Sequence, residues 1–432
     1  METGAILTSP TSPSTWLDMS NAINEIEGQQ SQQQLLDPPS QLTTYSSESD
    51  FTQQTLTTTS SIRTVPTRTS DSNTYVLSKV SSELKMQYDQ KPESVPDIAA
   101  EMEKWFAMTD RYGFLEEKAS STSNDKHKTK EVKRSGKWAK MSTSLMLHDD
   151  HIHKFSYTSK FKKRVYKGIP DCWRREAWYF LVTDRLKDAS KDHQLKTSYR
   201  ELLSKSSIHE RQIDLDIPRT LRDHIMFKQR YGSGQRALFN VLRAFANYDE
   251  EVGYCQGMTN IVATILMYCE EERAFLIFVH MFLRDKLHNL YKPGFPALME
   301  SFYIQDGLLK RYLPKLYHHL TSLGLSSDIY STRWYITLFS GGVINYHTLI
   351  RIWDVYYLCG FDVFFFVAIA LLRAYEARLL ASDLDGCMEI LGSTLSVPND
   401  DKFMKAVESL FEKNTRNNTV NKLRQEYKSR HR

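Results

Sequence analysis

The sequence predicts an all-α protein whose helical part follows a long polar segment. Between residues 160 and 415, apolar residues recur at the three- and four-residue spacing that buries one face of a helix. Few runs alternate between apolar and polar residues, as a strand would. An apolar content of 41% and an aromatic content of 12% are enough for a substantial core. The spacing is clearest in two neighbouring segments, at Leu238, Val241, Leu242 and Phe245 and then at Met258, Ile261, Val262, Ile265 and Leu266.

Composition divides the chain into four parts. Residues 1–79 are rich in Ser, Thr and Gln and hold too few apolar residues for a core, so we expect them to be disordered. Residues 80–136 are expected to form a helical and basic linker, and residues 137–415 the helical domain. Residues 416–432 form a basic tail, either an exposed helix or a frayed end.

The helices are expected to follow one another through the domain with short connections. Pro314 is expected to split or kink one of them, because proline breaks the helical hydrogen bonding. The most apolar run, 363–372, is half as long as the about 20 residues that cross a bilayer, so it is expected to be a helix buried in a soluble core. The predicted helical ranges are 98–108, 237–248, 258–266, 272–284, 299–323, 331–340, 347–358, 361–380, 384–391 and 402–413.

Charge, cysteine content and motif spacing exclude several function classes. The net charge of +4 is too small to argue for a nucleic-acid partner. The five cysteines are scattered, with no Cys-x-x-Cys pair, which indicates a reduced, intracellular protein without a zinc site. The segment 232–234 is rich in glycine but lacks the Lys-Ser/Thr of a phosphate-binding loop. We therefore expect no metal or cofactor of its own, and a chain that acts on a partner's site.

Two short segments carry the most distinctive chemistry. Residues 213–219 place Arg219 beside Pro218, and an arginine side chain is a planar fork of donors suited to phosphate oxygens. Residues 253–257 place Gln256 just before an amphipathic stretch. An amide can donate to and accept from one water, which is what orienting a nucleophilic water requires.

These segments resemble the IxxDxxR and YxQ motifs of the TBC (Tre-2/Bub2/Cdc16) domain family, the GTPase-activating domain for Rab-type GTPases. The matching residues are Ile213, Asp216, Arg219, Tyr254, Gln256 and Gly257. Three more blocks agree in order, with the patterns GIPxxxRxxxW, WxxxLF and RxWD. Their residues are Gly168, Ile169, Pro170, Arg174, Trp178, Trp334, Leu338, Phe339, Arg351, Trp353 and Asp354. The resemblance covers residues 137–413 and implies a fold of two helical lobes.

The resemblance also implies roles for the motif residues. Arg219 would be an arginine finger, inserted beside the γ-phosphate of a partner's GTP, and Gln256 a glutamine finger that positions the attacking water. Asp216 would position the arginine, and it could equally, or in addition, cap a helix that begins near Pro218. Tyr254 would pack beneath the finger loop.

Other motif residues are expected to support these two. Ile213 and Gly257 belong to the finger motifs, and a glycine lets the backbone bend sharply around the glutamine. The residues of the three remaining blocks are expected to stabilise the fold rather than to contact the partner.

The expected function is activation of GTP hydrolysis by a Rab-family GTPase in its GTP-bound state, in vesicle traffic. The partner would supply GTP and Mg²⁺, so the chain would act on another protein's catalytic site rather than run a reaction of its own.

One alternative is a catalytically silent TBC scaffold or adaptor, against which the presence of both Arg219 and Gln256 argues. Another is a helical interaction domain that the basic run at 118–140 recruits to anionic membrane. The same run could be a solvated helix face. The expected location is the cytoplasm, with peripheral recruitment to endomembranes as an option.

Overall fold

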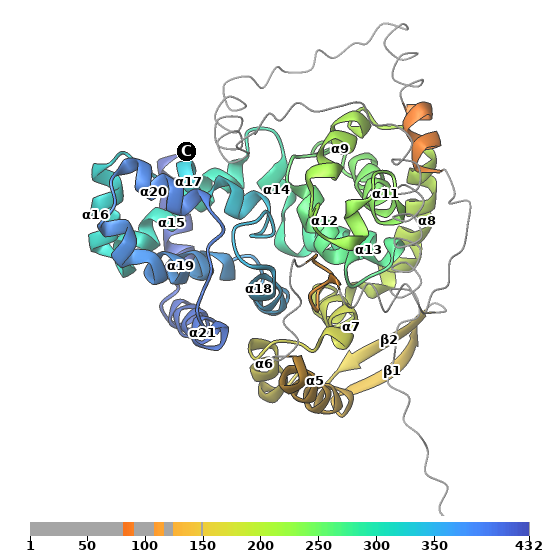
Figure 1. Cartoon of the computed structure of the whole chain (residues 1–432), viewed down its shortest axis with the longest axis horizontal. Helices are drawn as coiled ribbons and strands as arrows, with labels where there is room; N and C mark the ends of the chain where they lie inside the picture. The colour runs from red at the N-terminus through yellow and green to blue at the C-terminus, as the bar shows by residue number, and fades with distance from the viewer. Residues whose placement is uncertain (1–80, 90–107, 116–123, 148–149, 432) are drawn as a thin grey trace, which may run out of the picture.

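The computed structural model describes residues 81–89, 108–115, 124–147 and 150–431 (Figure 1). Within these ranges the protein is predominantly helical, which confirms the predicted all-α class. The expected disorder of the N-terminal tail concerns residues outside the described ones. The same holds for the helix predicted just before Met108.

The helices form two groups that lie side by side in Figure 1, with α14 and α18 between them. The first group, on the right and below, consists of α5 (Asn124–Ala139), β1 (Ser142–Leu147), β2 (Asp150–Phe155), α6 (Ser159–Tyr166), α7 (Asp171–Val182), η1 (Asp188–Lys191), α8 (Asp192–Ser204), α9 (Glu210–Asp216), η2 (Ile217–Arg219), α10 (Ile225–Lys228), α11 (Ser233–Tyr248), α12 (Met258–Leu266) and α13 (Glu271–Asp285). Between the groups lie α14 (His288–Tyr291) and α18 (Tyr346–Cys359). The second group consists of α15 (Pro296–Tyr312), α16 (Pro314–Ser322), α17 (Ser327–Ile336), α19 (Val363–Leu380), α20 (Leu384–Gly392), α21 (Asp400–Asn417) and α22 (Thr419–Arg430).

The predicted break at Pro314 is confirmed, since α15 ends at Tyr312 and α16 begins at the proline. The predicted helix 331–340 is shifted. The actual helix, α17, ends at Ile336, and the chain then turns with Leu338 and Phe339 at positive φ angles of 49° and 67°. A residue later in the sequence stabilises this turn, because the indole Nε1 of Trp353 donates to the carbonyl of Leu338 at 2.9 Å.

The apolar run 363–372 is buried throughout in α19, as predicted. Phe364 stacks on Phe339 and on Tyr356, with ring centroids 5.4 and 4.8 Å apart. This helix therefore lies in the core of the second group. Within the described ranges, no helix is long and apolar enough to cross a membrane.

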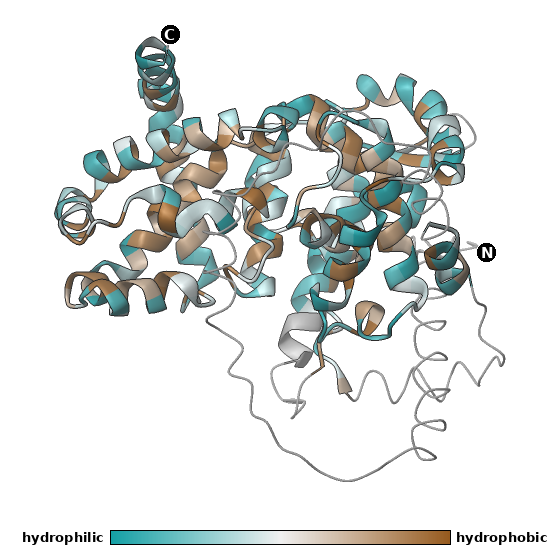
Figure 2. Cartoon of the chain, turned by 90° about the horizontal axis from the view of Figure 1, so that it is seen from above, coloured by the Kyte–Doolittle hydropathy of each residue, from teal (hydrophilic) through white to brown (hydrophobic). Residues whose placement is uncertain are grey.

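The last residues form a helix, α22, rather than a frayed end. Figure 2 shows it mostly in the teal of hydrophilic residues, running to the point marked C. Its inner face packs on α15, where Val420 is buried. Arg424 joins it to Glu300 of α15 and to Asp362 at the start of α19, each at 2.7 Å.

In the first group, the β1–β2 hairpin was not predicted, and the packing of α5 was predicted only in part. Strands β1 and β2 pair as an antiparallel hairpin, with Leu147 opposite Asp150. The sequence gives no strand signal there, because the buried residues of β2, Ile152 and Phe155, are three positions apart rather than two. In the basic run, α5 exposes the lysines whose side chains are described, Lys130, Lys133 and Lys137, but its Arg134 donates to the carbonyls of residues 167 and 168.

Candidate functional site

Arg219 lies at the junction of two short elements. Helix α9 ends at Asp216, and the 3₁₀ turn η2 follows directly, with Pro218 fixing its backbone. Ile217 is buried beneath this junction, whereas the Arg219 side chain is 47% exposed. The local sequence thus presents a cation at the surface from a turn anchored in the core.

A buried carboxylate holds the guanidinium. Asp216 is 2% exposed, and its Oδ1 accepts from Nη2 of Arg219 at 2.5 Å and from Nε2 of Gln212 at 3.1 Å. The side chain makes no cap hydrogen bond to η2. The geometry therefore disagrees with helix capping, one of the two roles considered for Asp216, and places its carboxylate in contact with Arg219.

The second oxygen of Asp216 reaches the other motif. Tyr254 donates its hydroxyl to Oδ2 at 2.5 Å, within the core. Burial, reinforced by the adjacent Asp216 carboxylate, raises the pKa of Tyr254 well above its ordinary value. The hydroxyl therefore stays protonated at neutral pH and acts as the donor. One carboxylate thus links Arg219 on η2 to the segment that carries Gln256, two residues beyond Tyr254.

Gln256 is exposed, and a tight backbone turn follows it. Gly257 has a φ of +105° and is the residue that caps α12. A Cβ added there would lie 3.0 Å from Cγ2 of Ile336 and 3.1 Å from Cγ2 of Thr337. Tyr291 fixes the backbone opposite Gly257, because its hydroxyl donates to the carbonyl of Ile336 at 2.7 Å. Both the backbone angle and the close approach require glycine here.

Two residues that contact the finger motifs, Gln212 and Tyr291, were not predicted from the sequence. Gln212 lies four residues before Asp216 on α9, a spacing that places the two side chains on one helix face and could have been recognised. Tyr291 is far from the motifs in sequence, and no local signal connects it to the glutamine turn. Ile213, as expected of a supporting residue, is fully buried on the same short helix.

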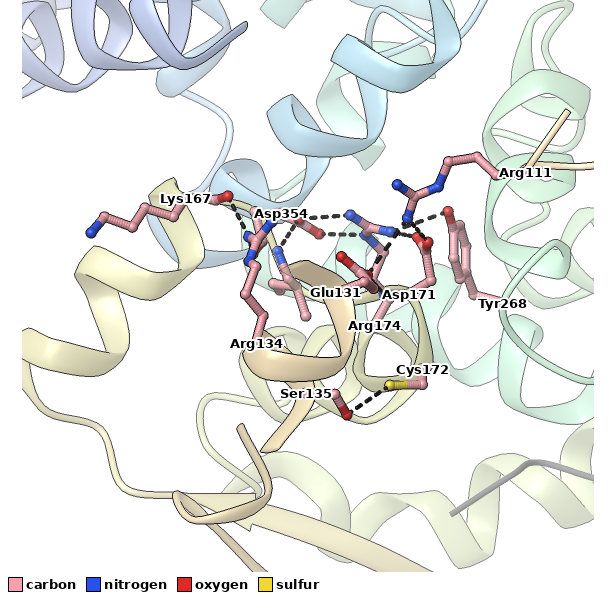
Figure 3. A network of polar contacts seen from close by, with 12 residues as sticks. Arg111, Glu131, Arg134, Ser135, Lys167, Asp171, Cys172, Arg174, Tyr268 and Asp354 are labelled. Carbon is pink, nitrogen blue, oxygen red and sulfur yellow. Dashed lines mark hydrogen bonds and ion pairs between the residues drawn. The ribbon is translucent and has the colours of Figure 1, made fainter. Parts of the chain in front are cut away.

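Two of the three remaining motif blocks, GIPxxxRxxxW and RxWD, meet in a second polar cluster (Figure 3). Asp354 of α18 is fully buried and accepts from Nε of Arg174 at 3.1 Å, from Nε1 of Trp178 at 2.9 Å and from the backbone N–H of Ile169 at 2.7 Å. Arg174 also pairs with Asp171 at the start of α7. The GIPxxxRxxxW and RxWD blocks therefore bind one another, and α7 of the first group is fixed to α18.

The other block residues complete this joint. Gly168, at a φ of +90°, precedes Ile169 and Pro170, and a Cβ there would come within 3.2 Å of Arg134 Nη2. Arg351 donates to the carbonyl of Tyr166 at 3.0 Å. The side chains of Trp334 and Trp353 are fully buried in the core.

Comparison with known proteins gives a consistent result. Residues 171–380 match the model of the Rab-GTPase-TBC domain family. A TBC domain-containing protein of Schizosaccharomyces pombe is 34% identical over 292 residues, which are 66% of this chain and 68% of that protein. A Rab GTPase-activating protein of Caenorhabditis elegans is 34% identical over 230 residues, 53% of this chain but only 24% of its own length.

A solved structure supports the fold. The crystal structure of the Chlamydomonas flagellar RabGAP TBC domain superposes with a TM-score of 0.57 at 24% identity, covering 69% of this chain and 97% of that one. Its helical architecture is the one described above. From the matched domain, the S. pombe relative and the joined motif blocks, we conclude that this chain belongs to the Rab-GTPase-TBC domain family.

Proposed function

We propose that the chain accelerates GTP hydrolysis by a Rab-family GTPase, with Arg219 as arginine finger and Gln256 as the residue that positions the attacking water. The family assignment supports this, as do relatives named Rab GTPase-activating proteins in C. elegans. The partner, in its GTP-bound state, supplies the nucleotide and Mg²⁺. The chain itself contributes two polar side chains in trans.

The observation that carries the proposal is the shared carboxylate. Asp216 accepts from Arg219 at 2.5 Å and from Tyr254 at 2.5 Å, so a single buried group orients both motif segments. The bond holds the half-exposed guanidinium in one direction at the surface. Because a guanidinium has five N–H donors, the bond to Asp216 leaves donors to meet phosphate oxygens.

The chemistry then follows from charge. Phosphoryl transfer spreads negative charge over the γ-phosphate oxygens, and a guanidinium placed beside them stabilises the transition state more than the ground state. Gln256 stands exposed next to the Gly257 turn, where its amide can hold a water in line for attack.

The direct test measures GTP hydrolysis by a panel of Rab-type GTPases with the full chain and with Gln256→Ala. We expect acceleration of one or a few GTPases and a loss on the order of 100-fold in the variant, since misplaced reacting groups cost about that much. The matched control is Gln194→Ala, which removes an exposed glutamine on α8 and should leave the rate unchanged. Binding without acceleration across the panel would instead indicate the scaffold.

Asp216→Asn probes the anchor itself. Asparagine keeps the size but offers one acceptor oxygen to Arg219 and Tyr254, so at least one donor would face an amide N–H₂. We expect the activation rate to fall about 10- to 100-fold, the effect of losing a hydrogen bond to a charged group. Kinetics of GTP hydrolysis at saturating activator measure this.

The control for the anchor is Asp223→Asn, whose carboxylate is 74% exposed on the following loop. It should change neither the rate nor the melting temperature. If Asp216→Asn lowers the melting temperature but keeps full activity, Asp216 is a structural residue only and the proposed anchor is wrong.

A further inference from the structure

A helix at residues 81–88 packs on the first helical group, although it lies well upstream of the matched domain at 171–380. It is the orange helix in Figure 1, beside α11. Its last residue, Tyr88, is 1% exposed. The ring of Tyr88 stacks on Phe239 of α11, with centroids 4.4 Å apart, and meets the edge of Tyr231 at 4.9 Å.

The hydroxyl of Tyr88 reaches α9, the helix that leads directly into η2 and Arg219. It donates to Oδ1 of Asp214 at 2.7 Å, across 126 residues of sequence. Arg230 completes the contact, with Nη2 at 2.8 and 2.7 Å from the two oxygens of Asp214. Arg236 on α11 donates to the carbonyl of Tyr88 at 3.2 Å and fixes the backbone of the segment.

Helix α9 needs such contacts, because seven residues are too few for a helix to be stable alone. Asp214 and Asp216 are two positions apart, about 200° around a helix at 3.6 residues per turn. Asp216 is held by Tyr254 on one side, and Asp214 by Tyr88 and Arg230 on another. The two carboxylates therefore fix both the rotation of α9 and the direction in which η2 leaves it.

We propose that residues 81–89 clamp α9, the helix before η2, and that Tyr88 is a positioning residue for Arg219. The inference rests on the proposed GTPase-activating function, and it adds a residue upstream of the matched domain to the machinery. The hydroxyl of Tyr88 contacts Asp214 and also accepts from Nη1 of Arg230 at 3.3 Å, so it acts on Arg219 only through α9. Losing its hydroxyl removes one of the contacts that set the rotation of α9, while the bonds from Arg230 to Asp214 and from Tyr254 to Asp216 remain.

The test uses the full chain with Tyr88→Phe, which keeps the ring stack and removes only the hydroxyl. The matched control is Tyr199→Phe. Tyr199 is 3% exposed on α8 and donates to Glu271 at 2.5 Å, so it loses an equivalent tyrosine–carboxylate bond away from α9. Two readouts are compared: hydrogen exchange of the amides of 210–217 in the chain alone, and kcat and KM for activation of a GTPase identified in the panel.

We expect Tyr88→Phe to speed exchange in α9 about tenfold and to lower kcat about three- to tenfold with KM unchanged, whereas Tyr199→Phe does neither. Unchanged exchange in α9 overturns the clamp, whether or not the chain activates any GTPase. Faster exchange with full kcat overturns the positioning role. If the wild-type chain activates nothing, the proposed function fails, and with it the positioning role, while the exchange result still decides whether the clamp holds α9.

Discussion

Arg219→Lys is expected to lower the activated rate of GTP hydrolysis by about 10³- to 10⁵-fold, the whole contribution of an arginine finger. At about 1.36 kcal/mol per tenfold, this is roughly 4–7 kcal/mol of barrier. Lysine keeps the positive charge but loses the planar fork of donors, and it cannot bond to Asp216 and a phosphate oxygen with one rigid group. Single-turnover hydrolysis by a GTPase that the wild-type chain activates measures the loss.

The matched control is Arg222→Lys, because Arg222 lies on the same loop and its side chain is 73% exposed. It should retain nearly full activity. Arg222→Lys should melt within about 1 °C of wild type, since surface substitutions rarely change stability by more than about 0.5 kcal/mol. Arg219→Lys keeps a positive charge beside the buried Asp216 carboxylate and should remain folded, which its melting curve checks. If Arg219→Lys keeps more than about a tenth of the activity, the finger assignment fails, because a point charge would then suffice.

Much of the site could be predicted, because its chemistry is encoded in short segments. Arg219 and Gln256 are recognisable by residue type and by the spacing of their neighbours. The role of Asp216 was open between two local possibilities, and the bond to Arg219 without a cap bond to η2 distinguishes them. The contact of Asp216 with Tyr254, 38 residues further on, could not be predicted. The hydrogen bond from Tyr88 to Asp214 could not be predicted, since a bond between distant segments produces no repeating residue pattern in the sequence of either segment.

The fold shows the same division between local and distant causes. Helices such as α11 and α12 were predicted because their apolar residues repeat at helical spacing. The end of α17 was misplaced, because the turn at Leu338 and Phe339 adopts left-handed angles that their side chains do not favour. Tertiary contacts such as the bond from Trp353 impose that turn. The hairpin was missed because most of β1 faces solvent and has no apolar alternation.

Removing Arg174 is expected to cause a large loss of stability. Burial raises the pKa of Asp354, and Arg174, with the N–H donors of Ile169 and Trp178, opposes that rise. Burial alone would lower the pKa of Arg174, but the Asp354 charge raises it above its ordinary value. Each charge thus depends on the other. Arg174→Met leaves Asp354 buried without its cation, which we expect to cost about 3–5 kcal/mol in the free energy of unfolding.

Urea unfolding of the full chain measures this cost, and Arg175→Met is the control on the next residue of α7. Arg175 also pairs with a carboxylate, Glu270 at 2.7 Å, but its side chain is 24% exposed, so its loss should cost less than about 1 kcal/mol. The double variant Arg174→Met, Asp354→Asn should cost at least about 1 kcal/mol less than the sum of the single changes, because no unpaired charge remains. Equal losses for Arg174→Met and Arg175→Met would contradict the ion pair as the joint between α7 and α18. The joint would then rest on apolar packing around Trp178, whose ring stacks on Tyr357 with centroids 5.0 Å apart.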